Sequence, residues 1–214
     1  MKIVAFVPIK LNNQRLPGKN LLPLGGKPIC KHILDTLLSI NGIEDIYVYC
    51  SDEQIKNYLP NGIKFLKRDA ALDGNFVKGI DIYKSFVNDV HADIYLLAHC
   101  TSPFIKASSI QYSLDIVKSK KYDSALAVEK KQTFAWYNGE VLNYEPQNVP
   151  RTQDIEPVYI ETSAFYIFNR ELLIEHNRRV GFNPFLCVID AFESIDIDEP
   201  NDFKLAQSVY EVIK

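Results

Sequence analysis

Two aspartates near the end of the chain have the spacing of a metal site. Asp196 and Asp198 occur in the sequence SIDIDEPND. If this segment is a strand, alternation places both carboxylates on one face and the intervening Ile197 on the other. Adjacent carboxylates repel each other unless a cation lies between them, and Mg²⁺ that carries a nucleotide prefers such hard oxygen ligands. The pair therefore indicates a magnesium site. The alternative is a polar strand end before a helix whose N-terminus accepts acids such as Asp202.

A basic loop near the N-terminus offers the positive charges that a triphosphate needs. Lys10, Arg15 and Lys19 fall within ten residues, together with Pro17, which stiffens the turn, and Gly18, which allows close backbone approach. Cations and backbone N–H groups bind phosphate oxygens together. The loop is not a Walker A loop, because GxxxxGK[ST] is absent. It predicts a phosphate cradle, with a solvated surface loop as the alternative.

Two further segments carry polar side chains that could meet a ligand. His99 and Ser102 lie in the sequence HCTSP, directly after an apolar run, and Arg151 and Gln153 lie in PRTQD. The first pair could hydrogen-bond a ligand or only stabilise the following turn. The second pair could point back toward a cleft or lie on the surface. The residue types alone leave both interpretations open.

The composition argues against several other classes of protein. The 214 residues are 47% hydrophobic and 24% charged, as in ordinary globular proteins, and carry a net charge of −3. There is no overall basic field, so nucleic acid is not an expected partner and any anion must be bound by a local cluster. Cys30, Cys50, Cys100 and Cys187 form no CxxC pair, so neither a zinc site nor a redox motif is indicated. We expect buried free thiols.

The pattern of apolar runs also bears on location. The N-terminal apolar run is too short for a signal peptide, and no segment has the length of a membrane span. We therefore expect no membrane partner and a cytoplasmic protein.

The candidate side chains must be positioned by a regular framework, and the chain predicts one. Short apolar runs alternate with segments of helical period, which is typical of βαβ units. We expect strands over 3–7, 45–50, 63–66, 93–98, 124–128 and 164–168, and helices from 28 onward, from an N-cap at 51–52 through 58, and over 76–90, 108–118 and 200–213. The fold class is therefore α/β with a mostly parallel central sheet flanked by helices. Ligands bind such sheets at the carboxyl ends of strands, where the basic loop begins.

One segment departs from this alternation. Residues 133–144 predict a hairpin, because Asn138-Gly139 supplies the two positive-φ residues of a type I′ turn. Several aromatic side chains, among them Trp136 and Tyr137, surround the turn. They either cover the core of the same chain or form a dimerisation arm. We expect a single domain over 1–214, with 130–160 as the candidate dimerisation excursion.

Four motifs in this order resemble those of the acylneuraminate cytidylyltransferases and their relatives for other 2-keto-3-deoxy sugar acids. They are RLPGKN at 15–20, TSP at 101–103, PRTQD at 150–154 and SIDIDEPND at 194–202, and the resemblance covers almost the whole chain. It implies a Rossmann-like fold, an arm exchanged in a homodimer, and transfer of CMP from CTP to the hydroxyl of an acidic sugar with loss of pyrophosphate. Mg²⁺ is the implied cofactor, and CTP and a small acidic acceptor are the implied partners.

The resemblance also assigns roles to residues. It implies Lys19, Arg15 and Asp198 as catalytic residues, Asp196 and Asp198 as metal ligands, and Lys10, Asn20, Arg68, Ser102, His99, Arg151 and Gln153 as substrate-binding residues. Cations and Mg²⁺ suit this chemistry, because negative charge builds on the departing pyrophosphate.

Three departures from the family pattern concern the substrates. Lys10 stands where the family usually has Arg, and His99 where the sialic acid enzymes have Gln. The segment expected to read close to Arg-x-Asn-Gly reads Ile160-Glu161-Thr162-Ser163, so the arginine for the sugar carboxylate is missing. Either another cation, with Arg151 and Lys106 as candidates, takes its place, or the acceptor is another keto-deoxy acid or a phosphonate. We expect efficient use of CTP and poor use of N-acetylneuraminate.

Two rival functions remain open at this stage. A sugar-nucleotide glycosyltransferase also carries a D-x-D motif, although usually in mid-domain rather than before the last helix. A non-catalytic nucleotide-binding protein would retain CTP without consuming it, and the intact Lys19, Asp196 and Asp198 argue against that function.

Overall fold

The computed structural model, which describes residues 1–213, is built on one seven-stranded sheet. The strand order is β11 (Pro184–Ile189), β7 (Ser124–Lys131), β10 (Val158–Asn169), β6 (Ile94–Ala98), β1 (Ile3–Ile9), β4 (Asp45–Cys50) and β5 (Ile63–Lys67). All neighbouring strands are parallel except β10, which is antiparallel to both β6 and β7. The predicted mostly parallel α/β sheet is confirmed.

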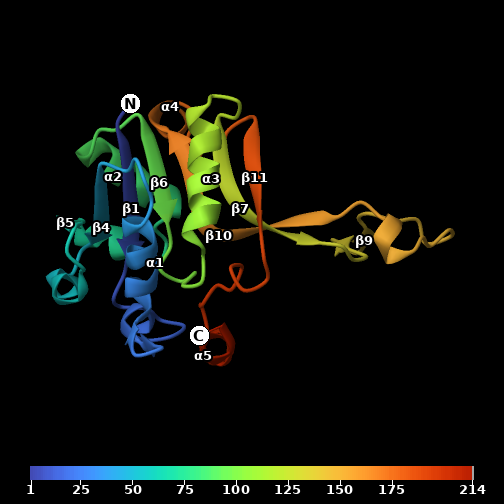
Figure 1. The fold of residues 1–214 in the computed structure, drawn as a ribbon, viewed down its shortest axis with the longest axis horizontal. Coiled ribbons are helices and arrows are strands. Elements are labelled where there is room, and N and C mark those ends of the chain that lie inside the picture. The colour runs from blue at the N-terminus through green and yellow to red at the C-terminus, as the bar shows by residue number, and fades with distance from the viewer. Residues whose placement is uncertain (214) are drawn as a thin grey trace.

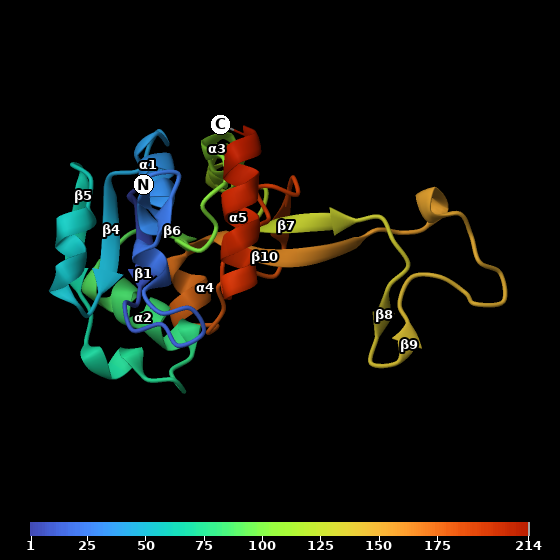
Figure 2. The same ribbon diagram turned by 90° about the horizontal axis from the view of Figure 1, so that it is seen from below.

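Helices cover both faces of this sheet (Figures 1 and 2). On one face, α1 (Ile29–Leu38) and α3 (Ala107–Lys118) pack against residues such as Ala5 and Val7 of β1. On the other, α2 (Gly79–Asp89) and α4 (Arg170–Ile174) pack against Val4 and Phe6. Successive β1 side chains thus enter opposite cores, which is why its sequence is continuously apolar. The last helix, α5 (Pro200–Ile213), lies over a third, smaller cluster, and no helix within residues 1–213 could cross a membrane.

The shorter elements lie outside the seven-stranded sheet. They are the 3₁₀ helices η1 (Lys19–Leu21), η2 (Glu53–Tyr58), η3 (Ala70–Asp73) and η4 (Thr152–Asp154), and the strand pairs β2 (Pro23–Leu24) with β3 (Lys27–Pro28) and β8 (Trp136–Tyr137) with β9 (Glu140–Val141). Asp52 caps η2 through the N–H of Gln54, as its sequence predicted, although the helix is 3₁₀ rather than α.

Three sequence expectations need correction. The segment with Asp196 and Asp198 is not a strand, because the edge strand β11 ends at Ile189 and no neighbour pairs with residues 195–198. The N–H of Ile197 instead donates to the carbonyl of Thr101 at 2.8 Å, and the Ile197 side chain is buried. In addition, β11 and α4 were not predicted, and β10 extends beyond the expected 164–168.

The hairpin at 133–144 forms as predicted. Asn138 and Gly139 have φ values of 51° and 82°, and Trp136 pairs with Val141. β7 and β10 lead out of the sheet to this hairpin and to η4, which lie away from the helices and the core (Figures 1 and 2). Trp136 is 62% and Tyr137 75% exposed, so these rings do not cover the core of their own chain.

Phe86 fixes α2 to the sheet, and its removal should destabilise the protein. The ring is fully buried and stacks on Phe6 with centroids 4.1 Å apart, with Tyr95 at its edge. We predict that Phe86→Ala lowers the free energy of unfolding by about 3–5 kcal/mol, because it leaves a cavity in a packed aromatic cluster. Urea denaturation measures this. The exposed Asn88→Ala on the same helix should change stability by less than about 0.5 kcal/mol.

The Asp123 carboxylate ties the loop between α4 and β11 to the start of β7. It accepts hydrogen bonds from the N–H groups of Phe182 (2.6 Å) and Asn183 (2.9 Å) and from the hydroxyl of Ser124 (2.9 Å). Burial alone would raise the pKa of Asp123, but these hydrogen bonds outweigh it and hold the pKa below its usual range. The carboxylate therefore stabilises the fold above the unfolded pKa, and this stabilisation is lost as the pH falls through the folded one.

We predict that Asp123→Asn costs about 1–3 kcal/mol at pH 7, because amide oxygens accept these bonds more weakly than a carboxylate does. The difference from the wild-type protein should shrink once the pH falls below about 4, where the unfolded aspartate takes up its proton. Urea titrations at pH 7, 5 and 3 measure it, with the exposed Glu44→Gln as the control. A difference that is independent of pH would show that the charge of Asp123 is not involved.

Candidate functional site

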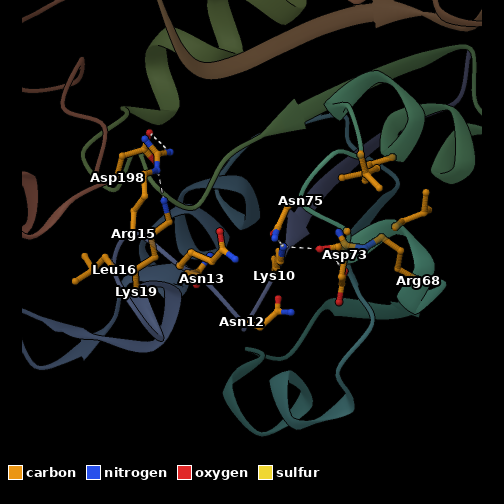
Figure 3. A pocket seen from close by; sticks show the side chains of 15 residues that line it. Lys10, Asn12, Asn13, Arg15, Leu16, Lys19, Arg68, Asp73, Asn75 and Asp198 are labelled. Atoms are coloured by element: carbon orange, nitrogen blue, oxygen red, sulfur yellow. Dashed lines mark hydrogen bonds and ion pairs between the residues drawn. The ribbon is translucent and has the colours of Figure 1, made fainter.

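A cavity of about 430 Å³ opens where the loop after β1 faces the segment before α5. Lys10, Arg15, Lys19, Arg68 and Asp198 line it together with polar residues of the loop that follows η3 (Figure 3). This volume is in the range of small-molecule sites. The cavity lies beyond the carboxyl end of β1, as expected for an open α/β sheet.

Asp198 is held by two cations of the basic loop. Its Oδ1 lies 2.7 Å from Lys19 Nζ, and its Oδ2 lies 2.6 Å from the guanidinium of Arg15. Both cations point toward this carboxylate in Figure 3. The sequence did not indicate this contact, which joins the predicted phosphate cradle to the predicted metal site. The loop is therefore part of a polar cleft rather than a solvated surface.

The burial of Lys19 follows from the local backbone. Gly18 has a φ of 64° and precedes η1, so the chain turns sharply and directs Lys19 inward. The Lys19 side chain is only 11% exposed and also donates to the carbonyl of Ile197 at 3.0 Å. Burial by itself would raise the pKa of Asp198, but the hydrogen bond and charge of Lys19, with the charge of Arg15, bring it below its usual range. Asp198 is therefore an anion at neutral pH.

Asp196 has the opposite environment. Burial raises the pKa of this carboxyl, and the nearby negative charge of Asp198 adds to the increase, although the Thr101 side chain opposes it. Its Oδ1 is buried and makes no hydrogen bond within residues 1–213. A buried carboxylate oxygen without a partner is costly unless a cation meets it. Asp196 and Asp198 therefore fit the two ligands that a divalent cation would need here.

A second basic cluster surrounds Asp73. Arg68 is 2% exposed, donates to the carbonyl of Ile9 at 3.0 Å and lies 2.5 Å from Asp73 Oδ1. Lys10 Nζ donates to the backbone carbonyl of Asp73 and lies 3.5 Å from Asn75 Oδ1. Arg68 and Lys10 thus line the same cavity, both in contact with Asp73 (Figure 3). The sequence had identified both cations but not Asp73.

Asn20 and Ser102 are both buried, and neither is among the residues that line this cavity. The amide of Asn20 donates to the carbonyl of Lys10 at 2.8 Å, and its oxygen accepts from the thiol of Cys100 at 3.1 Å. Asn20 therefore shapes the loop, whatever it also contributes to a ligand. Ser102 is 1% exposed, and its hydroxyl oxygen has no partner within residues 1–213. All four cysteines are free and buried, as expected.

His99 is held by contacts with Ser163 and Tyr83 and does not line this cavity. Its Nδ1 is 2.5 Å from the carbonyl oxygen of Ser163, so Nδ1 carries the proton, and Nε2 accepts from the Tyr83 hydroxyl at 3.3 Å. Burial lowers the pKa of His99, which keeps the ring neutral and preserves this tautomer. His99 is thus one wall of a polar cluster that also includes Arg179.

Arg151 and Gln153 do not meet the other predicted site residues in this chain. Both are exposed at η4, on the arm that leaves the sheet (Figure 2). Arg151 pairs with Asp154 at 2.7 Å within the same turn. The prediction that these two residues bind the nucleotide is not met within one chain.

Three residues around the cleft escaped the sequence analysis, namely Asp73, Tyr83 and Arg179. Each belongs to an element whose sequence has no recognisable motif, and each reaches the cleft only through the fold. Arg179 in the sequence NRRVGF carries a weak signal, since it is one of two adjacent arginines before an unpredicted strand.

Comparisons with known proteins agree with this geometry. The family model described as cytidylyltransferase matches residues 4–212. The CMP-N,N′-diacetyllegionaminic acid synthase of Legionella pneumophila is 30% identical over 99% of this chain and 97% of its own length. The N-acylneuraminate cytidylyltransferase of Streptococcus agalactiae is 25% identical over 95% of this chain, which spans only 52% of that relative.

Solved structures support the fold alone. A CMP:2-keto-3-deoxy-manno-octonic acid synthetase complexed with CTP superposes with a TM-score of 0.73 at 16% identity, and each chain is covered fully. The 4-diphosphocytidyl-2C-methyl-D-erythritol synthase of Anaerococcus prevotii gives a TM-score of 0.68 at 12% identity and covers 98% of this chain. The Rossmann-like fold expected from the motifs is confirmed. With the match of the family model across almost its whole length, the chain belongs to the cytidylyltransferase family of nucleotidyltransferases.

Proposed function

We propose that this protein transfers CMP from CTP to the hydroxyl of an acidic sugar of the sialic acid type and releases pyrophosphate. The acceptor oxygen forms a bond to the α-phosphorus as the bond from that phosphorus to the departing pyrophosphate breaks, and the acceptor hydroxyl loses its proton. The observation that carries this proposal is the contact of Lys19 and Arg15 with Asp198, since it joins phosphate-binding cations to a carboxylate suited to metal in one cleft.

The cations of the cleft suit a triphosphate. Lys19 and Arg15 line the cavity beside Asp198, and Lys10 and Arg68 line it beside Asp73. Without a ligand, each contacts a carboxylate or a carbonyl of the protein. Phosphate oxygens can replace these partners at little cost, because the new bonds are also charge-assisted. Lys19 and Arg15 would then stabilise the charge that develops on pyrophosphate.

Asp196 and Asp198 would hold Mg²⁺. The metal would supply a positive charge that neutralises the phosphates of CTP. Transfer of Lys19 and Arg15 to phosphate would free both oxygens of Asp198 for coordination beside the unpartnered oxygen of Asp196. Ser102, whose buried hydroxyl also lacks a partner, and Asn20 are proposed nucleotide contacts.

We further propose a single domain that dimerises through its arm over 130–160. The exposed rings of Trp136 and Tyr137 support this, because apolar patches of this kind usually mark interfaces. Arg151 and Gln153 would then serve the cleft of a second copy, which the arm can approach. A cytoplasmic location is also proposed, with the four free cysteines as its support.

The rival functions give different results in one experiment. Incubation with CTP, Mg²⁺ and a panel of sugar acids should release pyrophosphate in step with loss of the acid. A glycosyltransferase would not consume CTP, and a nucleotide-binding protein would bind CTP without releasing pyrophosphate. Absence of pyrophosphate with every acid would refute the proposed reaction.

We predict that activity requires a divalent cation and both aspartates. Asp196→Asn and Asp198→Asn should each lower kcat at least ~100-fold, because they weaken the metal site without changing side-chain size. EDTA should abolish pyrophosphate release, and added Mg²⁺ should restore it. Glu199→Gln is the matched control, since it removes one negative charge from an exposed neighbouring side chain. Full activity of the wild-type protein in EDTA would exclude the metal role, and so would full activity of either aspartate variant.

We predict a dimer whose stability depends on the arm. Sedimentation equilibrium at micromolar concentration should give twice the 24.5 kDa of one chain. The double variant Trp136→Ser with Tyr137→Ser should shift the mass toward that of one chain, because it removes two large apolar side chains. Phe76→Ser removes a fully exposed ring outside the arm and should leave the mass unchanged. A wild-type protein that sediments as a monomer would contradict the prediction.

A further inference from the structure

A charged and aromatic cluster next to His99 has no role in the proposed binding of CTP. Glu161 and Tyr166 come from β10, Tyr83 from α2, and Arg179 from the loop between α4 and β11. The Tyr166 ring lies edge-on to His99 with centroids 6.2 Å apart. The cluster thus contacts His99 through Tyr83 and Tyr166.

The guanidinium of Arg179 is fixed at the centre of this cluster. Its Nη2 lies 2.7 Å from Glu161 Oε1, its Nη1 lies 3.4 Å from the Tyr83 hydroxyl, and its plane lies over the Tyr166 ring, 4.0 Å from the centroid. Tyr166 also donates its hydroxyl to Glu161. The guanidinium has five N–H donors, of which these contacts use two. The remaining donors are available to an anion.

The loop that carries Arg179 is held firmly. On one side, Arg178 donates to the carbonyls of Val180 and Gly181 at 2.9 and 2.8 Å. On the other, Asp123 accepts from the N–H groups of Phe182 and Asn183. A preorganised arginine loses less entropy when it binds an anion than a free surface side chain would.

Arg179 is accessible from solvent through a cavity. A hollow of about 350 Å³ is lined by Gly79, Tyr83, Arg179 and Val180, and the Arg179 side chain is 32% exposed. Val77, just before α2, and Ile82, within it, line the proposed nucleotide cavity. The start of α2 therefore borders both that cavity and the hollow beside Arg179. An acceptor in the second hollow would lie next to a nucleotide in the first.

The two cations suggested by motif position are engaged elsewhere. Lys106, the N-cap residue of α3, pairs with Asp190 and lies 3.6 Å from Glu193. Arg151 pairs with Asp154 on the arm. Neither contacts His99 or its neighbours in this chain, whereas Arg179 shares Tyr83 with His99.

We propose that Arg179 binds the carboxylate of the acceptor acid, in place of the arginine that is missing from residues 160–163. The inference rests on the proposed function, because it requires an acidic acceptor. Glu161 does not prevent this binding, since its charge is directed to Nη2 of Arg179 and to the Tyr166 hydroxyl. Charge-assisted hydrogen bonds to the free edge of a fixed guanidinium give the recognition its direction.

The test compares an acid with its own methyl ester, in which the carboxylate charge is absent. At saturating CTP and Mg²⁺, kcat/KM is measured for N-acetylneuraminate, N,N′-diacetyllegionaminate and 3-deoxy-manno-octulosonate, and then for the methyl ester of the best substrate. The proteins are the wild type, Arg179→Gln, Arg179→Lys and, as a matched loss of one positive charge on α2, Lys84→Gln. Thermal melting confirms that each variant is folded.

We expect Arg179→Gln to raise KM for the acid at least tenfold, to leave KM for CTP unchanged and to leave the ester unaffected. Arg179→Lys keeps the charge but loses the planar pair of N–H donors of the guanidinium, and its KM for the acid should be intermediate. Lys84→Gln should match the wild type. The proposal is overturned if Arg179→Gln reduces the use of acid and ester equally, or if it leaves the preference for the acid intact. If the wild-type protein releases no pyrophosphate with any acid, the proposed function fails first and the inference fails with it.

Discussion

The contact between Lys19 and Asp198 is the interaction on which the cleft depends. It joins two segments 179 residues apart, one leaving the first strand and one entering the last helix. A buried ammonium group is tolerated only with a nearby anion and further hydrogen bonds, and Lys19 obtains these from Asp198 and from the carbonyl of Ile197. The same contact keeps Asp198 ionised. Asp198 and its two cations therefore have partners of opposite charge within the protein itself.

In the proposed function, this pairing would allow one small cleft to take up both a polyanion and a cation. A triphosphate alone would meet Asp196 and Asp198, and a metal ion alone would meet Lys19 and Arg15. With both ligands bound, Lys19 and Arg15 would exchange the carboxylate of Asp198 for phosphate oxygens. Asp198 would exchange these two cations for the metal ion. Burial raises the pKa of Asp196 and so disfavours its ionised form. A cation beside this carboxyl would stabilise the ionised form again.

Features that depend on sequence neighbours could be predicted from the sequence, and features that depend on tertiary contacts could not. The apolar runs predicted the central strands, and Asn138-Gly139 predicted the hairpin turn with its positive φ values. The five-residue helix α4 is too short to show a helical period. The alternation at Asp196 and Asp198 indicated a strand, but a strand requires a neighbour, and the sequence does not reveal where the sheet ends. The same limit hid Arg179, because its partners Glu161 and Tyr83 lie on other elements.

An irregularity of β10 brings together the polar cluster around His99 and Arg179. The register shifts between Glu161, which pairs with Val128, and Tyr166, which pairs with Leu126. Ser163 lies in this interval with a φ of 60°, a conformation that costs a non-glycine residue roughly 1–2 kcal/mol. The bend directs the Ser163 carbonyl to His99 Nδ1, which fixes the tautomer of the ring. It also allows Tyr166 to reach back to Glu161, the carboxylate that orients Arg179. A regular strand would place side chains alternately on its two faces and would separate these groups, so the strain at Ser163 is offset by the polar contacts that the bend makes possible.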